Sequence, residues 1–79
     1  MHKKTLLENV DKIHTTEMGI GRIQKNLGID EEPVDYCISK LEKEDSKVTR
    51  EGKNYYVDVD GCTITINSSS YTIITAHKK

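Results

Sequence analysis

The chain has 79 residues, of which 34% are hydrophobic, and a formal net charge of −1 at pH 7. This length suits one domain over residues 1–79 and excludes a cofactor-binding domain joined to a second substrate lobe. The near balance of charge excludes the strongly basic surface of proteins that hold nucleic acid mainly by electrostatic attraction.

The distribution of special residues narrows the class further. No apolar run is long enough to span a membrane and no signal peptide opens the chain, so we expect a cytoplasmic protein without membrane contact. Cys37 and Cys62 lack metal-ligand spacing and lie within apolar patterns, which favours buried thiols. Neither cysteine forms a ligand motif with His14 or His77, so we expect no metal and no cofactor.

A first helix is predicted from Thr5, which forms a capping box with Glu8. Apolar residues follow at helical spacing, and this helix should end near His14.

A second helix is predicted to start at Thr15 or Thr16 and to end at Gly28. Gly19 and Gly21 lie inside it. Glycine disfavours a helix interior, so these residues either weaken the first turns of the helix or mark a close approach of another part of the chain.

A third helix is predicted after Asp30, which we expect to cap it, with Pro33 tolerated in the first turn. Its apolar residues share one face and its acidic residues the other. The expected apolar stripe is Val34, Cys37, Ile38 and Leu41.

The strongest structural signal is a period of two between residues 55 and 66, with Asp60-Gly61 as a two-residue turn. This turn pairs Val59 with Cys62 and places every alternate apolar residue on one face. The remaining expected pairs are Val57 with Ile64 and Tyr55 with Ile66.

Two further strands complete the expected sheet. One lies around Val48 and is joined to the hairpin by a turn at Glu51-Gly52, and the last spans Tyr71 to Ala76 after a polar loop. We therefore predict an α+β fold, with two or three helices (about 5–44) on one face of a four-stranded antiparallel meander (about 47–77).

The corner between the first two helices carries a candidate site. His14 is a titratable group, and Arg22, Lys25 and Asn26 follow on one face of the second helix. These groups suit a phosphate. The alternative is that His14 complements a helix end and that the cations form an ordinary solvated face.

The last strand carries a second candidate, His77, with Tyr71 and Thr75 in the same strand. An imidazole there suits general acid or base catalysis. The alternative is that the tail His77 to Lys79 keeps the chain soluble.

Two surfaces suit a partner. Tyr56, Thr63 and Thr65 share the polar face of the hairpin, where a tyrosine can stack on an RNA base and hydroxyls can meet phosphate groups. A polar face left in water is the alternative. The third helix presents Glu31, Glu32 and Asp35, and residues 30–45 contain seven acidic residues against two basic ones, a balance that suits a protein partner.

Four sequence elements resemble a small bacterial family catalogued only as a domain of unknown function. They are His-Thr-Thr-Glu at 14–17, Arg-Ile-x-x-Asn-Leu at 22–27, Gly-Lys-Asn at 52–54 and Tyr-Thr-Ile-Ile-Thr-Ala-His at 71–77. The resemblance covers nearly the whole chain and implies no established activity.

The predicted order of helices and strands is also remotely similar to the barnase, colicin and RelE-type toxin ribonucleases. This resemblance implies RNA cleavage by attack of the 2′-hydroxyl on the adjacent phosphate, without a metal. His14 and His77 would then be the proton-transfer pair. Arg22, Lys25 and Asn26 would hold phosphate, and Tyr71 and Thr75 would position the substrate.

The sequence as a whole favours a non-catalytic interaction or regulatory protein that acts through the acidic helix or the polar sheet face. A metal-independent endoribonuclease is the alternative. We expect a protein partner. RNA and a second copy of the chain are the alternative partners. The ribonuclease hypothesis depends on the last strand bringing His77 close to the corner at His14.

Overall fold

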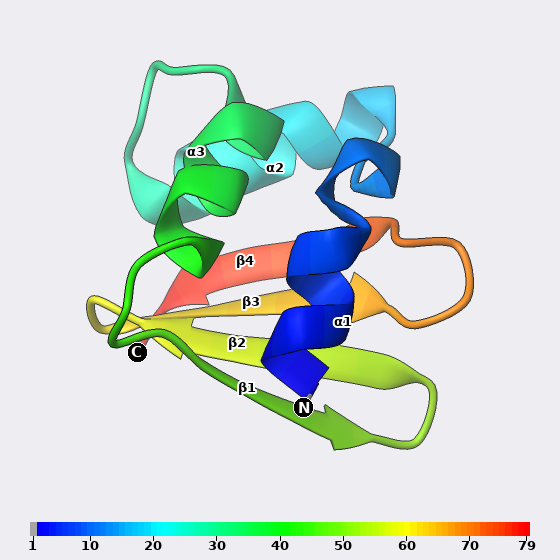
Figure 1. Cartoon of the computed structure of the whole chain (residues 1–79). Coiled ribbons are helices and arrows are strands. Elements are labelled where there is room, and N and C mark those ends of the chain that lie inside the picture. Colours follow the sequence, from blue (N-terminus) through cyan, green and yellow to red (C-terminus); the bar gives the residue numbers. More distant parts are fainter. Residues whose placement is uncertain (1) are drawn as a thin grey trace.

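The structure, a computed structural model that describes residues 2–79, has two layers. Figure 1 shows all the helices on one face of a single sheet whose strands follow chain order and are antiparallel. The predicted α+β fold is therefore confirmed. The elements are α1 (His2–Glu8), η1 (Val10–Lys12), α2 (Glu17–Leu27), α3 (Pro33–Leu41), β1 (Lys47–Glu51), β2 (Asn54–Val59), β3 (Cys62–Asn67) and β4 (Ile73–Lys78).

The hairpin of β2 and β3 has the predicted register. Val59 lies opposite Cys62, and the two other predicted pairs are also present. Asp60 and Gly61 have φ angles of 50° and 72°, the left-handed conformation that a two-residue hairpin turn requires. The alternation of buried and exposed residues and the turn chemistry therefore specify the same pairing.

The turn before this hairpin is one residue later than predicted. Glu51 still pairs with Asn54, so the connecting residues are Gly52 and Lys53 rather than Glu51-Gly52. Gly52 takes a φ of 60°, which explains why glycine is needed at the first turn position.

Strand β4 starts and ends two residues later than predicted. Tyr71 has a φ of 59° and belongs to the preceding loop. In that loop the side-chain oxygen of Asn67 accepts hydrogen bonds from the amides of Ser69 and Ser70, both at 2.9 Å. At the other end pairing continues, since the Lys79 amide donates to the Gly61 carbonyl at 2.8 Å.

A β-bulge interrupts β4. Thr65 pairs with Thr75 and Ile66 pairs with Ile73, which leaves Ile74 as an extra residue without a partner on β3. Ile74 is 43% exposed. The sequence pattern did not predict this bulge.

The first helix differs most from its prediction. It begins at His2 and ends at Glu8, and Thr5 lies inside it, so the predicted capping box is wrong. Within this early first turn, the Lys3 ammonium donates to three carbonyl oxygens in the connection between α3 and β1. These belong to Lys43, Glu44 and Ser46, at 2.7, 3.2 and 3.1 Å.

Helix α2 has the predicted ends. The Thr16 hydroxyl accepts from the Gly19 amide at 3.0 Å, and Gly28 closes the helix with a φ of 67°. A Cβ added at Gly19 would overlap the Thr15 hydroxyl, whereas Gly21 faces open space. Gly19 therefore marks a close approach of another part of the chain, which was one of the two predicted alternatives. Gly21 does not.

Helix α3 is capped by Glu32 rather than by the predicted Asp30. The Glu32 carboxylate accepts from the Asp35 amide at 2.8 Å, and Pro33 occupies the first position of the helix. Asp30 lies too far before Pro33 to reach the first free amides of this helix.

The core lies between the helical layer and one face of the sheet. Both cysteines are buried and unpaired, as predicted. Burial raises the pKa of the Cys37 thiol to about 12, with smaller contributions from Glu32 and Cys62, so this thiol is unreactive at neutral pH. Fully buried side chains include Leu6, Ile23, Leu41, Val57, Ile64, Ile66 and Ile73.

Candidate functional site

The corner at His14 is tied to the start of β4 by main-chain hydrogen bonds. The His14 amide donates to the Tyr71 carbonyl at 3.2 Å, and the Ile73 amide donates to the His14 carbonyl at 2.7 Å. These bonds form an isolated parallel bridge between His14 and Thr72. Two of the sequence elements that carry the family resemblance therefore meet here.

The His14 imidazole is part of a chain of side-chain hydrogen bonds, which we call the His14–Thr72 relay. Nδ1 lies 2.8 Å from the Lys12 carbonyl, which only accepts, so Nδ1 carries a hydrogen, and in the neutral ring Nε2 is the acceptor. Nε2 then accepts from the Thr72 hydroxyl at 3.1 Å. The Ser70 hydroxyl lies 2.8 Å from Thr72 Oγ1 and completes the relay.

His77 lies at the far end of the same strand. It pairs with Thr63, whereas His14 contacts Thr72 before the strand begins. His77 follows Thr72 by five positions along the chain, which corresponds to roughly 16 Å of extended strand. The structure therefore does not bring the two imidazoles together around one phosphate.

Helix α2 packs along β4 between these two ends. Its N-terminal end is fixed by the Thr15 hydroxyl, which donates to the Ile73 carbonyl at 3.0 Å. At its C-terminal end, Gly28 lies beside the Lys78 ammonium.

The predicted phosphate-binding residues are exposed but stand away from His14. Arg22, Lys25 and Asn26 lie in the middle and last turns of α2. Lys25 is nine residues beyond the Thr16 cap, about 13 Å along the helix axis.

The two predicted positioning residues are also separated. Tyr71 is half-buried at the His14 corner, with the Lys12 ammonium 5.8 Å from the centre of its ring. Thr75 lies farther along, opposite Thr65 on the sheet.

The sheet face away from the helices, which we call the open face, carries the predicted polar residues. Tyr56, Thr63 and Thr65 alternate with buried core residues, which places them there. Three cross-strand rows form this face. The central row is Thr49, Tyr56, Thr65 and Thr75; one flanking row is Lys47, Asp58, Thr63 and His77; the other is Glu51, Asn54 and Asn67.

The central row is uncharged and partly sheltered. Thr65 is only 6% exposed although no helix covers it, because Tyr56 and Thr75 flank it on the neighbouring strands. Tyr56 itself is half-buried.

The Asp58 carboxylate in the flanking row is paired. One carboxylate oxygen of Asp58 accepts from the Lys79 ammonium and from the Thr63 hydroxyl, both at 2.9 Å. These two hydrogen bonds lower the pKa of Asp58, with the bond from Lys79 contributing most. Lys47 lies opposite Asp58 on β1.

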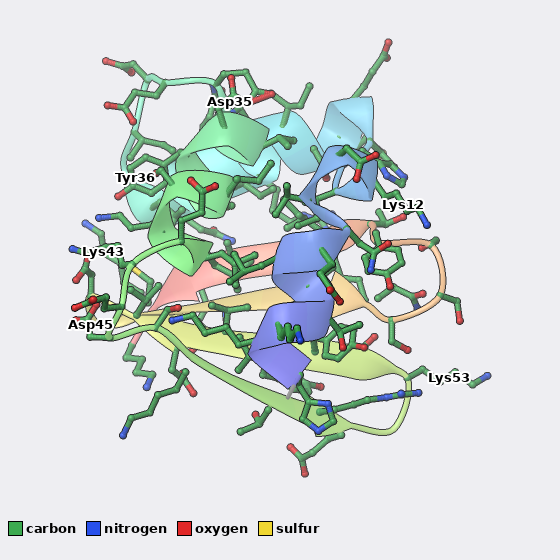
Figure 2. The ribbon with its side chains drawn as sticks, in the orientation of Figure 1. Lys12, Asp35, Tyr36, Lys43, Asp45 and Lys53 are labelled. Carbon is green, nitrogen blue, oxygen red and sulfur yellow. The ribbon has the colours of Figure 1, made fainter. Side chains whose placement is uncertain are left out.

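The acidic residues predicted at the third helix are exposed, but one of them has a structural role. Glu32 is occupied as the helix cap. Figure 2 shows Asp35 on the outer side of the helical layer and Asp45 at the end of the molecule that carries Lys43. Lys43 and Lys40 both bind Asp60 at the hairpin turn, at 2.8 and 2.7 Å.

Residues 2–79 enclose no pocket, and within this range no three metal-binding side chains gather in one place. No helix among these residues is long and apolar enough to cross a membrane.

Comparison with known proteins identifies the family. The model of DUF3781, described as a protein of unknown function, matches residues 7–77. The chain belongs to this family. No curated protein and no solved structure matches it. The predicted membership is thus confirmed, whereas the remote resemblance to toxin ribonucleases stays a prediction.

Sequence reasoning selected His14 in this DUF3781 domain but missed its partners. Thr72 and Ser70 are 58 and 56 residues away along the chain, so no local spacing connects them to His14. The available signal was the presence of Thr72 in a second family element, which suggested that Thr72 matters but not that it contacts His14.

Proposed function

We propose that this DUF3781 domain is a non-catalytic binding protein of the cytoplasm whose open face recognises a protein partner. The observation that carries the proposal is the central row of that face, which is uncharged, contains Tyr56, and lies under no helix.

The arrangement of this face matches the general anatomy of protein interfaces. Such interfaces have a centre depleted in charge and enriched in aromatic residues, surrounded by a polar rim. Here Tyr56 and threonine hydroxyls occupy the centre, and Lys47, Asp58 and Glu51 stand around them. A half-buried tyrosine on a strand loses little conformational freedom on binding, which favours it as an energetic anchor.

The charges on the open face favour protein over RNA. Affinity for nucleic acid comes largely from cations that neutralise phosphates. Lys79 is bound to Asp58, and Lys47 lies opposite the same carboxylate. An uncharged partner surface with hydrogen-bonding groups therefore complements this face better than a phosphate backbone.

The other predicted functions find less support in the geometry. An endoribonuclease built on His14 and His77 needs both imidazoles at one phosphate, and about 16 Å of strand lies between their positions. The acidic surface of Glu31 and Asp35 remains a second predicted docking site, and it serves as the internal comparison in the test.

The test is affinity capture from a nuclease-treated lysate of the source organism, with three matched baits. Thr49→Arg adds a long charged side chain to an exposed central-row position, and Tyr56→Ala removes the anchor. The double variant Glu31→Lys, Asp35→Lys reverses the acidic surface and leaves the Glu32 cap intact.

We expect one protein to bind the wild type with a saturable isotherm and to lose roughly tenfold or more in affinity for both open-face variants, a change of about 1.4 kcal/mol or more. The acidic-surface variant should bind like the wild type. The proposal is overturned by no saturable protein ligand, by loss only in the acidic-surface variant, or by binding that requires RNA. Light scattering on the purified chain identifies a second copy as the partner if Thr49→Arg abolishes dimers.

A further inference from the structure

The His14–Thr72 relay has the order of groups that activates a hydroxyl for nucleophilic attack. In such sites a hydroxyl donates to an imidazole nitrogen, and the other nitrogen is held by a third group. Here Thr72 donates to Nε2 of His14 at 3.1 Å, and the Lys12 carbonyl fixes Nδ1–H at 2.8 Å. The arrangement belongs to the His14 corner and is independent of the open face.

We propose that Thr72 is a base-activated nucleophile that accepts an acyl group from small activated esters. His14 acts as the base, and the Lys12 carbonyl holds the tautomer in which Nε2 is free to take a proton. The proposal does not rest on the protein-binding function.

The step balances without any further reactant. Thr72 Oγ1 attacks the carbonyl carbon of the ester while its proton passes to Nε2 of His14. The tetrahedral intermediate then collapses, the bond to the leaving oxygen breaks, and that oxygen takes the proton from Nε2. The products are an ester on Thr72 and a free alcohol, and His14 is again neutral.

The main chain holds the two reacting residues in place. The parallel bridge fixes the backbone at both His14 and Thr72, so the hydroxyl and the imidazole meet without further rearrangement. His14 and Ser70 are exposed and Thr72 is half-buried, so a small ester reaches the relay from solvent.

The expected rate of Thr72 acylation depends on the group that holds Nδ1 of His14, the Lys12 carbonyl. A backbone carbonyl orients the imidazole, but it lacks the negative charge with which a carboxylate stabilises imidazolium. We therefore expect slow acylation of one site per chain and a persistent ester, in place of rapid turnover.

The test uses p-nitrophenyl acetate on the full chain, with intact mass and peptide mapping as readouts. Thr72→Val keeps the shape but lacks the hydroxyl. His14→Gln keeps a polar side chain but is no base. Thr72→Ser retains the nucleophile, and Ser70→Ala removes only the outer hydroxyl.

In the wild type we expect one acetyl ester at Thr72. His14→Gln should slow its formation roughly 100-fold. Thr72→Ser and Ser70→Ala should both acquire the ester, whereas Thr72→Val should not.

Circular dichroism confirms that each variant is folded. If a single variant does not fold, the double variant Thr72→Ser, His14→Gln tests the need for the base instead, because it keeps a hydroxyl at position 72 and lacks the imidazole. Acetylation confined to lysines, mapping to Ser70, or equal rates with and without His14 each overturn the proposal.

Discussion

The two faces of the sheet are built from the same strands but are constrained in different ways. On the covered face, Val57, Ile64 and Ile66 are completely buried against the helices. On the open face, Tyr56 and Thr63 alternate with them and meet no helix. Packing therefore decides which residues occupy one face, while the other is available for binding. Substitutions should consequently divide into those that change stability and those that change binding.

The largest expected effect is on the covered face. Ile64→Ala removes a buried side chain and should cost about 2–5 kcal/mol of unfolding free energy, a large share of the stability of a small domain. Thr49→Ala, at an exposed central-row position, should change it by about 0.5 kcal/mol or less. Urea denaturation followed by circular dichroism measures both. Similar losses for the two variants would contradict the division between the faces.

A second comparison uses the two glycines inside α2. Gly19→Ala should destabilise by about 1–3 kcal/mol, because the new Cβ overlaps the Thr15 hydroxyl that is bonded to β4. Gly21→Ala should stabilise by roughly 0.5–1 kcal/mol, because its Cβ enters open space and glycine disfavours a helix. Thermal melts of both variants give the sign directly. Stability changes of the same sign in both variants would contradict the close approach at Gly19.

The N-terminal cap of α2 gives a third comparison, between two substitutions at Thr16. Thr16→Ala removes the hydroxyl that accepts from the Gly19 amide and should cost about 1 kcal/mol. Thr16→Ser retains the acceptor and should restore most of that loss. Denaturation of the pair tests the cap, and an equal loss in both variants would assign the effect to the methyl group instead.

The smallest expected effect is electrostatic and depends on pH. Hydrogen bonds from Lys40, and to a lesser extent Lys43, lower the pKa of Asp60 below its usual 3.8. A lowered folded-state pKa stabilises the fold above 3.8, and this contribution disappears as pH falls through the lower folded value. The difference in unfolding free energy between wild type and Asp60→Asn should therefore shrink below about pH 4. A difference of equal size at neutral and strongly acidic pH would exclude this ion pair as its cause.

Local rules predicted the parts of the fold that depend on neighbours in sequence. The hairpin register followed from alternation and the Asp60-Gly61 turn, and α2 followed from Thr16 and Gly28. The start of β4 could not be predicted in this way, because Tyr71 takes a positive φ and its carbonyl accepts from the amide of the distant His14. At the start of α1, Lys3 binds carbonyls 40 to 43 residues away, which no local spacing reveals.

The candidate sites also differ in whether local sequence patterns could predict them. The polar face was predictable, since period-two alternation places Tyr56, Thr63 and Thr65 together. The relay was not, because its partners come from the loop before β4. The proposed meeting of His14 and His77 is absent from the structure, since the two histidines lie at opposite ends of the extended strand β4.

The most direct measurement is a methyl NMR titration of the threonine- and isoleucine-labelled domain with its purified partner. The account predicts that the methyl signals of Thr49, Thr65 and Thr75 shift or broaden, while those of the buried Ile23 and Ile64 stay nearly unchanged. Unchanged threonine signals on the open face, combined with shifts at Ile20 of α2 or Ile38 of α3, would place the partner on the helical layer and contradict the proposed function.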